Sequence, residues 1–191
     1  MYIAIEGIDT AGKSTQIAAL QKHFSDAIIT KEPGGTAIGA EIRSLVLSAK
    51  AQSKKAEFLL FLADRAEHIQ EVIKPNLDKM IISDRSVVSG VAYALSQGEI
   101  NETAIVHLNR FATDGIYPQK VFLLKLTKEE LEYRLSQKEL DGIELRGSAY
   151  LLDIQEAIIK AAKLLNIELV EIDATKSIAN VTNEILNNIN S

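Results

Sequence analysis

The chain has 191 residues, of which 47% are hydrophobic and 25% charged, a composition typical of a soluble globular protein with one compact domain. Its net charge of −5 argues against an extended nucleic-acid surface, because such a surface needs a basic face. There is no cysteine, which excludes disulfides, thiolate metal sites and thiol nucleophiles.

The first residues and the apolar runs bear on location. Residues 1–6 lack a basic segment and Glu6 interrupts their apolar run, which argues against a signal peptide. No stretch approaches the roughly 18 consecutive apolar residues of a membrane span. We therefore expect a cytoplasmic protein with neither a membrane nor a nucleic acid as partner.

Short β-like runs alternate with helix-length segments along the chain. The helical segments lie at 13–24, 37–48, 54–74, 87–96, 101–113, 128–137, 149–165 and 176–189. Pro75 should end the third, because a residue that precedes proline avoids the helical region. The expected strands lie at 2–6, 27–30, 80–83, 121–126 and 168–172.

Several of these strands are continuously apolar, as expected for parallel strands that are covered on both faces. The alternation predicts an α/β fold, a doubly wound parallel sheet of five strands with helices on both faces. In such sheets ligands bind beyond the carboxyl ends of the strands, so we expect the functional residues in the segments that follow each strand.

A complete phosphate-binding motif, G-x-x-x-x-G-K-[ST], follows the first strand at residues 7–14. Its glycines let successive N–H groups face an anion, and the helix that begins near Lys13 adds its positive end. Lys13 would reach the β- and γ-phosphates of ATP, and Ser14 would bind Mg²⁺. A glycine turn of another kind is the alternative, which the flanking strand and helix disfavour. The predicted donor site consists of Gly7, Ile8, Asp9, Thr10, Ala11, Gly12, Lys13, Ser14 and Thr15.

Charged residues also follow the second and third strands. Asp84, after the third strand, can hold Mg²⁺ through water, and Arg85 beside it can meet phosphate. A surface ion pair that caps the strand is the alternative. The sequence KEPGGT at 31–36 forms a rigid turn before a helix that carries Arg43, and by itself it is compatible with a plain connection.

The helix expected at 54–74 carries Phe61 and Arg65 four residues apart, hence on one face. A ring and a guanidinium so placed can stack on a base and hydrogen-bond its edge. The alternative is a core phenylalanine with an arginine whose head reaches solvent. The segments 56–63 and 66–73 are apolar nearly all round, which suggests burial against another helix and predicts a homodimer.

Residues 134–147 are of mixed charge and form a candidate lid that closes over phosphates with Arg134, Lys138 or Arg146. A solvated helix end is the alternative. The three histidines show no spacing typical of a metal site or a catalytic triad, and we expect His23, His68 and His107 at the surface.

Four motifs in this order resemble the bacterial thymidylate kinases, a family of P-loop nucleoside monophosphate kinases. They are EGIDTAGKST at 6–15, KEPGGT at 31–36, FLADR at 61–65 and DRSVVSGVAY at 84–93. The resemblance covers almost the whole chain, including DGIE at 141–144 and DATKS at 173–177. It implies a single domain over 1–191, a homodimer, ATP as donor, Mg²⁺, and phosphorylation of dTMP to dTDP in dTTP biosynthesis.

The resemblance also implies roles for individual residues. Phe61 would stack on thymine and Arg65 would hydrogen-bond its carbonyl edge. Asp9 would meet the 3′-hydroxyl of the sugar, while Tyr93 would crowd the 2′ position and disfavour ribonucleotides. The other implied contacts are Arg43 and Arg85 to the acceptor phosphate, Ser89 near the base, Asp84 near the metal, and 175–177 near the adenine.

The chain departs from the family pattern where Ser86 replaces a common tyrosine or histidine and Gly142 replaces the usual lid arginine. Some members carry an arginine in the P-loop, where this chain has Thr10. Another cation must then offset the charge of the transferring phosphoryl group. A helix from 128 places Arg134 and Lys138 on one face, so we favour this pair as catalytic, with Arg146 next.

Three other functions also use a phosphate-binding loop. A P-loop kinase for a different nucleotide or small metabolite is the nearest alternative. A GTPase switch needs a guanine-reading N-K-x-D element, and the sequence contains none. A relative that binds nucleotide without turnover is also compatible with the sequence.

Overall fold

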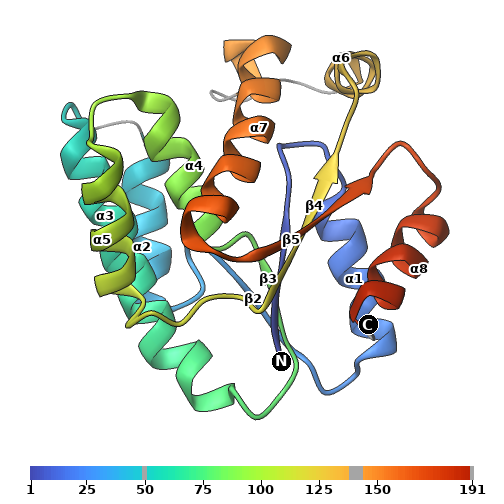
Figure 1. Ribbon diagram of the computed structural model, residues 1–191, viewed down its shortest axis with the longest axis horizontal. Helices are drawn as coiled ribbons and strands as arrows, with labels where there is room; N and C mark the ends of the chain where they lie inside the picture. Colours follow the sequence, from blue (N-terminus) through green and yellow to red (C-terminus); the bar gives the residue numbers. More distant parts are fainter. Residues whose placement is uncertain (49–50, 138–143, 190–191) are drawn as a thin grey trace.

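The computed structural model describes residues 1–48, 51–137 and 144–189. Its centre is a sheet of five parallel strands in the order β2-β3-β1-β4-β5, which confirms the predicted α/β fold (Figure 1). Each strand lies within about two residues of its predicted position. The strands are β1 (Tyr2–Glu6), β2 (Ile28–Lys31), β3 (Ile81–Asp84), β4 (Lys120–Lys125) and β5 (Glu168–Asp173).

The central strand β1 is buried along its whole length, between β3 and β4. Ile3, Ala4 and Ile5 have no exposed surface, as the continuous apolar pattern of a parallel strand predicts. In register, Ile5 pairs with Asp84 of β3 and with Phe122 of β4. The carboxyl ends of β1 and β3 therefore lie side by side at one edge of the sheet.

Helices cover both faces of the sheet (Figure 1). Helices α1 and α8 pack together on one side, and α4 and α7 pack together on the other. Helices α3 and α5 pack against α4, and α2 packs against α3. The helices are α1 (Lys13–His23), α2 (Ala37–Leu47), α3 (Lys54–His68), α4 (Val87–Gln97), α5 (Glu102–Ala112), α6 (Lys128–Ser136), α7 (Ser148–Leu165) and α8 (Ile178–Ile189), with a 3₁₀ turn η3 (Glu144–Arg146) before α7.

Side-chain caps explain where several of these helices begin. The hydroxyl or amide oxygen of the capping residue accepts a backbone N–H of the first turn, which has no partner within the helix. Caps of this kind precede α2, α3, α4, α5 and α6 and are formed by Thr36, Ser53, Ser86, Asn101 and Thr127.

The end of α3 differs from the prediction. The chain continues as a π-helical turn η1 (Ile69–Ile73) and a 3₁₀ turn η2 (Lys74–Asn76). Lys74 is helical, with φ −55° and ψ −46°, so the prediction that the residue before Pro75 leaves the helical region was wrong. Pro75 lies at the start of a new turn, where its missing N–H is not needed. Buried Ile69 and Ile73 hold the segment against the body of the protein.

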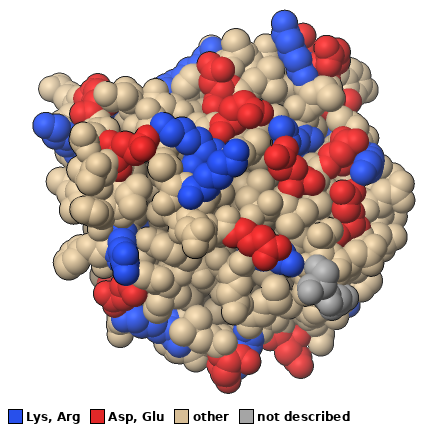
Figure 2. Space-filling model, viewed as in Figure 1, with Lys and Arg blue, Asp and Glu red and all other residues tan. Residues whose placement is uncertain are grey.

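No helix within the described ranges is both long and apolar enough to cross a membrane. On the face shown in Figure 2, acidic and basic side chains are interspersed, and neither sign forms a continuous surface. This face therefore offers no broad basic surface to an anionic ligand (Figure 2).

Candidate active site

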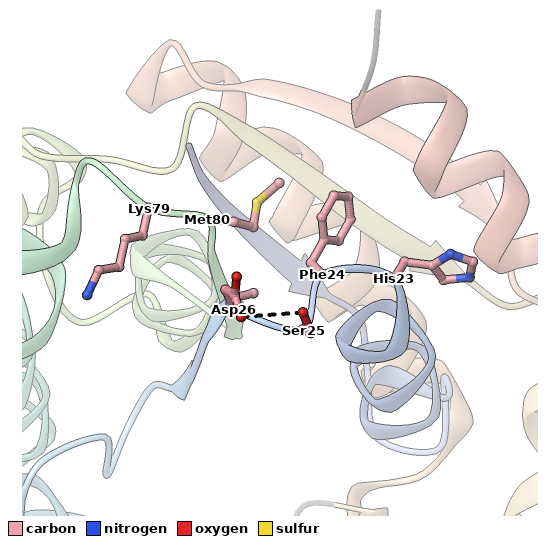
Figure 3. A pocket seen from close by; sticks show the side chains of 7 residues that line it. His23, Phe24, Ser25, Asp26, Lys79 and Met80 are labelled. Carbon is pink, nitrogen blue, oxygen red and sulfur yellow. Dashed lines mark hydrogen bonds between the residues drawn. The ribbon is translucent and has the colours of Figure 1, made fainter.

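Two hollows lie at opposite ends of the strands. The larger, of about 650 Å³, is lined by residues 23–27 with Lys79 and Met80, before β2 and β3 begin (Figure 3). The smaller, of about 360 Å³, lies at the carboxyl ends of β2 and β3 and is lined by Ser14, Lys31, Asp84 and their neighbours. Because ligands of doubly wound folds bind at the carboxyl ends of strands, the smaller hollow marks the candidate site.

The phosphate-binding loop connects β1 to α1 in the way that its sequence predicts. Gly7 has φ +153°, and a Cβ there would lie 3.0 Å from the Leu124 carbonyl oxygen of β4. Only glycine lets the loop pass so close to the neighbouring strand. The loop ends at Gly12, which precedes α1 in a left-handed conformation. The first amides of α1 are therefore presented at the sheet edge, as an anion site requires.

Lys13 is the first residue of α1, and its buried side chain points back into this loop. Its Nζ donates to the Gly7 and Ile8 carbonyl oxygens at 3.2 and 3.1 Å, and lies 3.8 Å from Asp9 Oδ1. Burial, and next the charge of Arg85, lower the pKa of Lys13 to about 8. A phosphate beside the ammonium group would raise that pKa again, so the ligand and the charge favour each other.

The residues predicted to bind Mg²⁺ border the smaller hollow together. Asp84 Oδ1 is buried and has no hydrogen-bond partner among the described residues, and Ser14 is exposed at the start of α1. A buried carboxylate oxygen without a donor suits a hard cation, so this pair fits Mg²⁺. No group of three His, Asp or Glu side chains suited to a metal occurs among the described residues, so phosphate oxygens and water would have to complete the coordination.

Arg85 follows β3 and reaches back to the phosphate-binding loop. Its Nη1 donates to the Gly7 carbonyl oxygen at 3.0 Å and to Ser89 Oγ at 3.2 Å, and its Nη2 donates to Asp9 Oδ1 at 2.8 Å. The backbone of Arg85 has φ +69°, a left-handed conformation that is strained for a residue with a side chain. The guanidinium thus lies between the donor loop and α4.

Three side chains of α3 hold the end of β2 and the turn that follows it. Asp64 Oδ1 accepts the Gly34 N–H at 2.9 Å, and Arg65 Nε donates to Glu32 Oε1 at 2.9 Å. His68 Nε2 lies 2.7 Å from Thr30 Oγ1. From the helix that follows the turn, Arg43 Nη1 donates to the Pro33 carbonyl oxygen at 3.0 Å. The turn that carries KEPGGT is therefore fixed by side chains rather than left as a plain connection.

His68 corrects the prediction that the histidines lie at the surface. His23 and His107 are exposed, but only 1% of the His68 side chain is accessible. Burial lowers the pKa of His68 to about 4, although the charge of Asp64 opposes this shift. The imidazole is therefore neutral at physiological pH and bonds to Thr30 from within the core.

Arg65 is buried, which excludes the alternative in which its head reaches solvent. Beyond Glu32, its Nη1 donates to Asn109 Oδ1 of α5 at 2.5 Å. Its Nη2 faces Gly90 of α4, where an added Cβ would lie only 2.2 Å from that nitrogen. Phe61 is half-buried one helical turn earlier. Two of the three guanidinium nitrogens are thus held by hydrogen bonds, and the third, Nη2, is packed against Gly90.

The other predicted acceptor residues gather near Arg85. Ser89, on α4, receives its hydrogen bond, and Asp9 forms an ion pair with it across the loop. Tyr93 lies one turn further along α4, and burial raises the pKa of its hydroxyl to about 12, so it stays neutral. The structure therefore brings Asp9, Arg85, Ser89 and Tyr93 together, although they come from two separate segments.

The candidate lid is only partly described. Arg134, on α6, donates to the Thr10 carbonyl oxygen at 3.0 Å and to the Ala174 carbonyl oxygen at 2.8 Å. It therefore links the phosphate-binding loop to the loop after β5. Arg146 lies over the Tyr150 ring, with its Cζ 4.9 Å from the ring centre, and donates to the Tyr150 hydroxyl at 2.9 Å. Lys138 and Gly142 fall outside the described residues, so the predicted Arg134–Lys138 pair is not seen as a pair.

Comparison with known proteins decides the family. A family model described as thymidylate kinase matches residues 5–185. The chain belongs to the thymidylate kinase family. Thymidylate kinase of Sulfurimonas denitrificans is 82% identical over 190 residues, which is 100% of each chain. Thymidylate kinase of Wolinella succinogenes is 56% identical over 177 residues, 93% of this chain and 92% of the relative.

A solved structure agrees with this membership. The crystal structure of thymidylate kinase from Ehrlichia chaffeensis has a TM-score of 0.74 and 27% sequence identity, and the match covers 100% of this chain and 98% of that one. The resemblance of four short motifs to the thymidylate kinase family is therefore confirmed over the whole length of the chain.

Several buried polar residues around the site were missed at the level of sequence. Glu6, Glu32, Asp64 and Asn109 are all at most 6% exposed and hydrogen-bonded to predicted site residues or to their loops. The position of Glu6 in the sequence does carry a signal for such a role. A charge at the end of an apolar strand, directly before a phosphate-binding motif, already indicates a carboxylate beneath the site.

His68 makes the stability of this thymidylate kinase family member depend on pH. The unfolded chain binds a proton at His68 below about pH 6.5, whereas the folded chain does so only near pH 4. Stability is therefore lost as pH falls from about 6.5 to about 4, because the unfolded state then binds more protons. Between pH 7 and pH 5 this should lower the free energy of unfolding by about 2 kcal/mol.

Urea unfolding of the natural chain and of His68→Gln at pH 7 and pH 5 measures this loss. The variant should lose about 2 kcal/mol less than the natural chain over that interval. His23→Gln, a change at an exposed histidine, is the control and should follow the natural chain. Equal losses in all three proteins would contradict the neutral, buried state of His68.

Proposed function

We propose that the protein transfers the γ-phosphoryl group of ATP to dTMP, producing ADP and dTDP for dTTP biosynthesis. One observation carries this proposal. In a chain of the thymidylate kinase family, Arg85, which is suited to a second phosphate group, lies directly beside a complete phosphate-binding loop. The donor loop follows β1 and Arg85 follows the adjacent strand β3, so two phosphate groups can be held side by side.

The donor phosphates would bind to the amides of the loop at 7–15. Lys13 now bonds to the Gly7 and Ile8 carbonyl oxygens, and it would exchange these bonds for phosphate oxygens. Thr10 Oγ1 is buried without a hydrogen-bond partner among the described residues, and is therefore also available to a phosphate oxygen. Ser14 and Asp84 would hold Mg²⁺, which supplies positive charge to the donor phosphates when bound.

The acceptor would bind at the edge formed by β2, β3 and α3. Arg85 and Arg43 would hold its phosphate, and Asp9 its 3′-hydroxyl. Phe61 would cover one face of thymine while Arg65 Nη2, the guanidinium nitrogen beside Gly90, reads the edge of the base. Tyr93 would exclude a 2′-hydroxyl and Ser89 would lie nearby.

In this reaction the protein would position the two phosphate groups and stabilise their negative charge, and it would form no covalent bond to either substrate. An oxygen of the dTMP phosphate forms a bond to the γ-phosphorus while the bond to the β–γ bridging oxygen breaks and ADP leaves. The attacking oxygen is already anionic, so no strong general base is needed. Lys13 and Arg85 would offset the repulsion between the two phosphate groups, and Arg134 and Lys138 would add charge from a lid at about 134–147 of a single domain.

We also propose a homodimer built on α2, α3 and α5. The predicted apolar surface of α3 is partly used within the chain, since Phe58 and Leu62 are buried, but Leu59 is 56% exposed. Leu45 on α2 is also exposed, and Phe111 on α5 is 81% exposed. Large apolar side chains exposed on neighbouring helices are typical of a protein interface.

A cytoplasmic location stays a prediction from the sequence.

The function is tested by a panel of acceptors. With ATP and Mg²⁺, formation of ADP should be fastest with dTMP among dTMP, dUMP, UMP, AMP, GMP and CMP. Lys13→Ala should lower kcat roughly 10²-fold or more, the scale of losing one electrostatic contact to the transition state. Circular dichroism of this variant should show a folded protein.

A different preferred acceptor would replace dTMP in this proposal while leaving the donor site intact. A folded Lys13→Ala variant with normal turnover would remove the donor loop from the mechanism. Nucleotide binding without any turnover by the natural chain would identify a non-catalytic relative of the thymidylate kinases.

The base pocket is tested at Arg65 and Gly90. Arg65→Ala should raise the KM for dTMP roughly ten- to a hundredfold, because a buried hydrogen bond to the base is worth about 1–3 kcal/mol, and should leave the KM for ATP nearly unchanged. Gly90→Ala should act in the same direction, because the new methyl group would displace Arg65 Nη2. Equal damage to both substrates would indicate that Arg65 serves only the fold.

The dimer is tested by sedimentation. At micromolar concentration the natural chain should sediment at about twice its mass of 21.0 kDa. Leu59→Glu should shift it towards the monomer, because a charge would be buried in the interface. Leu77→Glu, the same change at an exposed leucine outside these three helices, is the matched control. A natural chain that is monomeric and fully active would refute the proposed dimer.

A further inference from the structure

The carboxylate of Glu6 lies beneath the candidate site, completely buried at the carboxyl end of β1. It directly precedes the phosphate-binding loop, yet none of its hydrogen bonds goes to that loop. All of them come from the first turn of α4 instead. Burying a charged carboxylate costs free energy unless hydrogen-bond donors compensate it. The donors that surround Glu6 therefore indicate its role.

Three groups of α4 donate to Glu6. Oε1 accepts the Ser86 hydroxyl at 2.8 Å and the Ser89 backbone N–H at 3.3 Å, while Oε2 accepts the Ser89 hydroxyl in a very short contact. Burial raises the pKa of Glu6, and Arg85 and the serine donors oppose that rise. The carboxylate thus joins the end of β1 to the helix that follows Arg85.

Ser89 links Glu6 to Arg85. A serine hydroxyl has a single hydrogen, and here it is donated to Glu6 Oε2. The lone pairs that are left can only accept, and one of them receives Arg85 Nη1 at 3.2 Å. An ionised carboxylate cannot donate, so its charge fixes the direction of the whole chain of bonds from Arg85 through Ser89 to Glu6.

We propose that Glu6 is a positioning residue that sets the orientation of the Arg85 guanidinium through the Ser89 hydroxyl. The inference rests on the proposed role of Arg85 in holding the acceptor phosphate. Arg85 has a strained backbone, and its guanidinium has two further acceptors, the Gly7 carbonyl oxygen and Asp9. Both of these belong to the donor loop, so the bond to Ser89 is what holds the guanidinium towards α4. Loss of this bond would leave Nη1 with the Gly7 carbonyl oxygen alone, and the guanidinium would lose its link to α4.

A purely structural role for Glu6, as an anchor for the first turn of α4, makes a different prediction. Ser86 distinguishes the two roles, because its hydroxyl donates to the same carboxylate and caps α4 but makes no hydrogen bond to Arg85. Removal of its hydroxyl should lower stability without changing the pose of Arg85. Ser86→Ala is therefore the matched control.

The experiment compares Glu6→Gln, Ser89→Ala, the double variant and Ser86→Ala, with the KM for dTMP, the KM for ATP, kcat and thermal unfolding measured for each. Glutamine keeps the shape of Glu6 but replaces one acceptor with a donor. Glu6→Gln and Ser89→Ala should each raise the KM for dTMP roughly tenfold and leave the KM for ATP nearly unchanged. The double variant should be no worse than the more damaging single one, because both changes break the same chain of bonds.

Several results would overturn the proposal. If the carboxyl group were protonated, glutamine would reproduce its hydrogen bonding, and Glu6→Gln would leave the KM for dTMP unchanged. If the rises in the KM for dTMP of the two single variants multiply in the double variant, Glu6 and Ser89 act independently. That result, or an equal rise in the KM for dTMP in Ser86→Ala, would mean that Glu6 is only a structural anchor. If Glu6→Gln does not fold, a normal KM for dTMP in Ser89→Ala is by itself enough to overturn the proposal. An Arg85→Ala variant with unchanged kinetics would instead refute the proposed role of Arg85.

Discussion

The buried ion pair between Arg65 and Glu32 is the interaction on which the proposed acceptor side of the site depends. Both side chains are at most 5% exposed, and they join α3 to the turn after β2. Such a pair contributes little net stability, because desolvation offsets its attraction, but loss of one partner leaves a buried charge and costs about 3–5 kcal/mol. The pair therefore specifies one arrangement of the turn and one orientation of the guanidinium, which is what recognition of a base edge requires.

Around the phosphate-binding loop, positive and negative groups already neutralise each other. Lys13 and Arg85 face Asp9, the loop carbonyl oxygens and, through Ser89, Glu6. Polar groups that are oriented before the substrate arrives need little rearrangement during the reaction. In the proposed reaction, phosphate oxygens would replace the acceptors that Lys13 and Arg85 now have, so neither cation would need to move far.

The sequence predicted what is local and continuous. Apolar runs gave the five strands, and motifs such as residues 7–14 gave the ends that carry the site, because side chains close in sequence share one turn. Pairings across large separations were not predictable: His68 with Thr30, Arg65 with Asn109 and Glu6 with Ser89 depend on how helices pack. Lys74 became helical because buried isoleucines hold the segment before it, which outweighs the local preference of Pro75.

Backbone hydrogen bonds extend the sheet one residue into the loops that follow β2, β3 and β5. The N–H groups of Glu32, Arg85 and Ala174 donate to carbonyl oxygens of the adjacent strands at 2.9–3.0 Å. Each loop therefore starts at a fixed height above the sheet. One residue inserted in β3 would turn Asp84 to the opposite face, because side chains alternate along a strand. Length variation among related chains should consequently gather in the connections at the amino ends of the strands, such as residues 113–119, where it leaves the chemistry untouched.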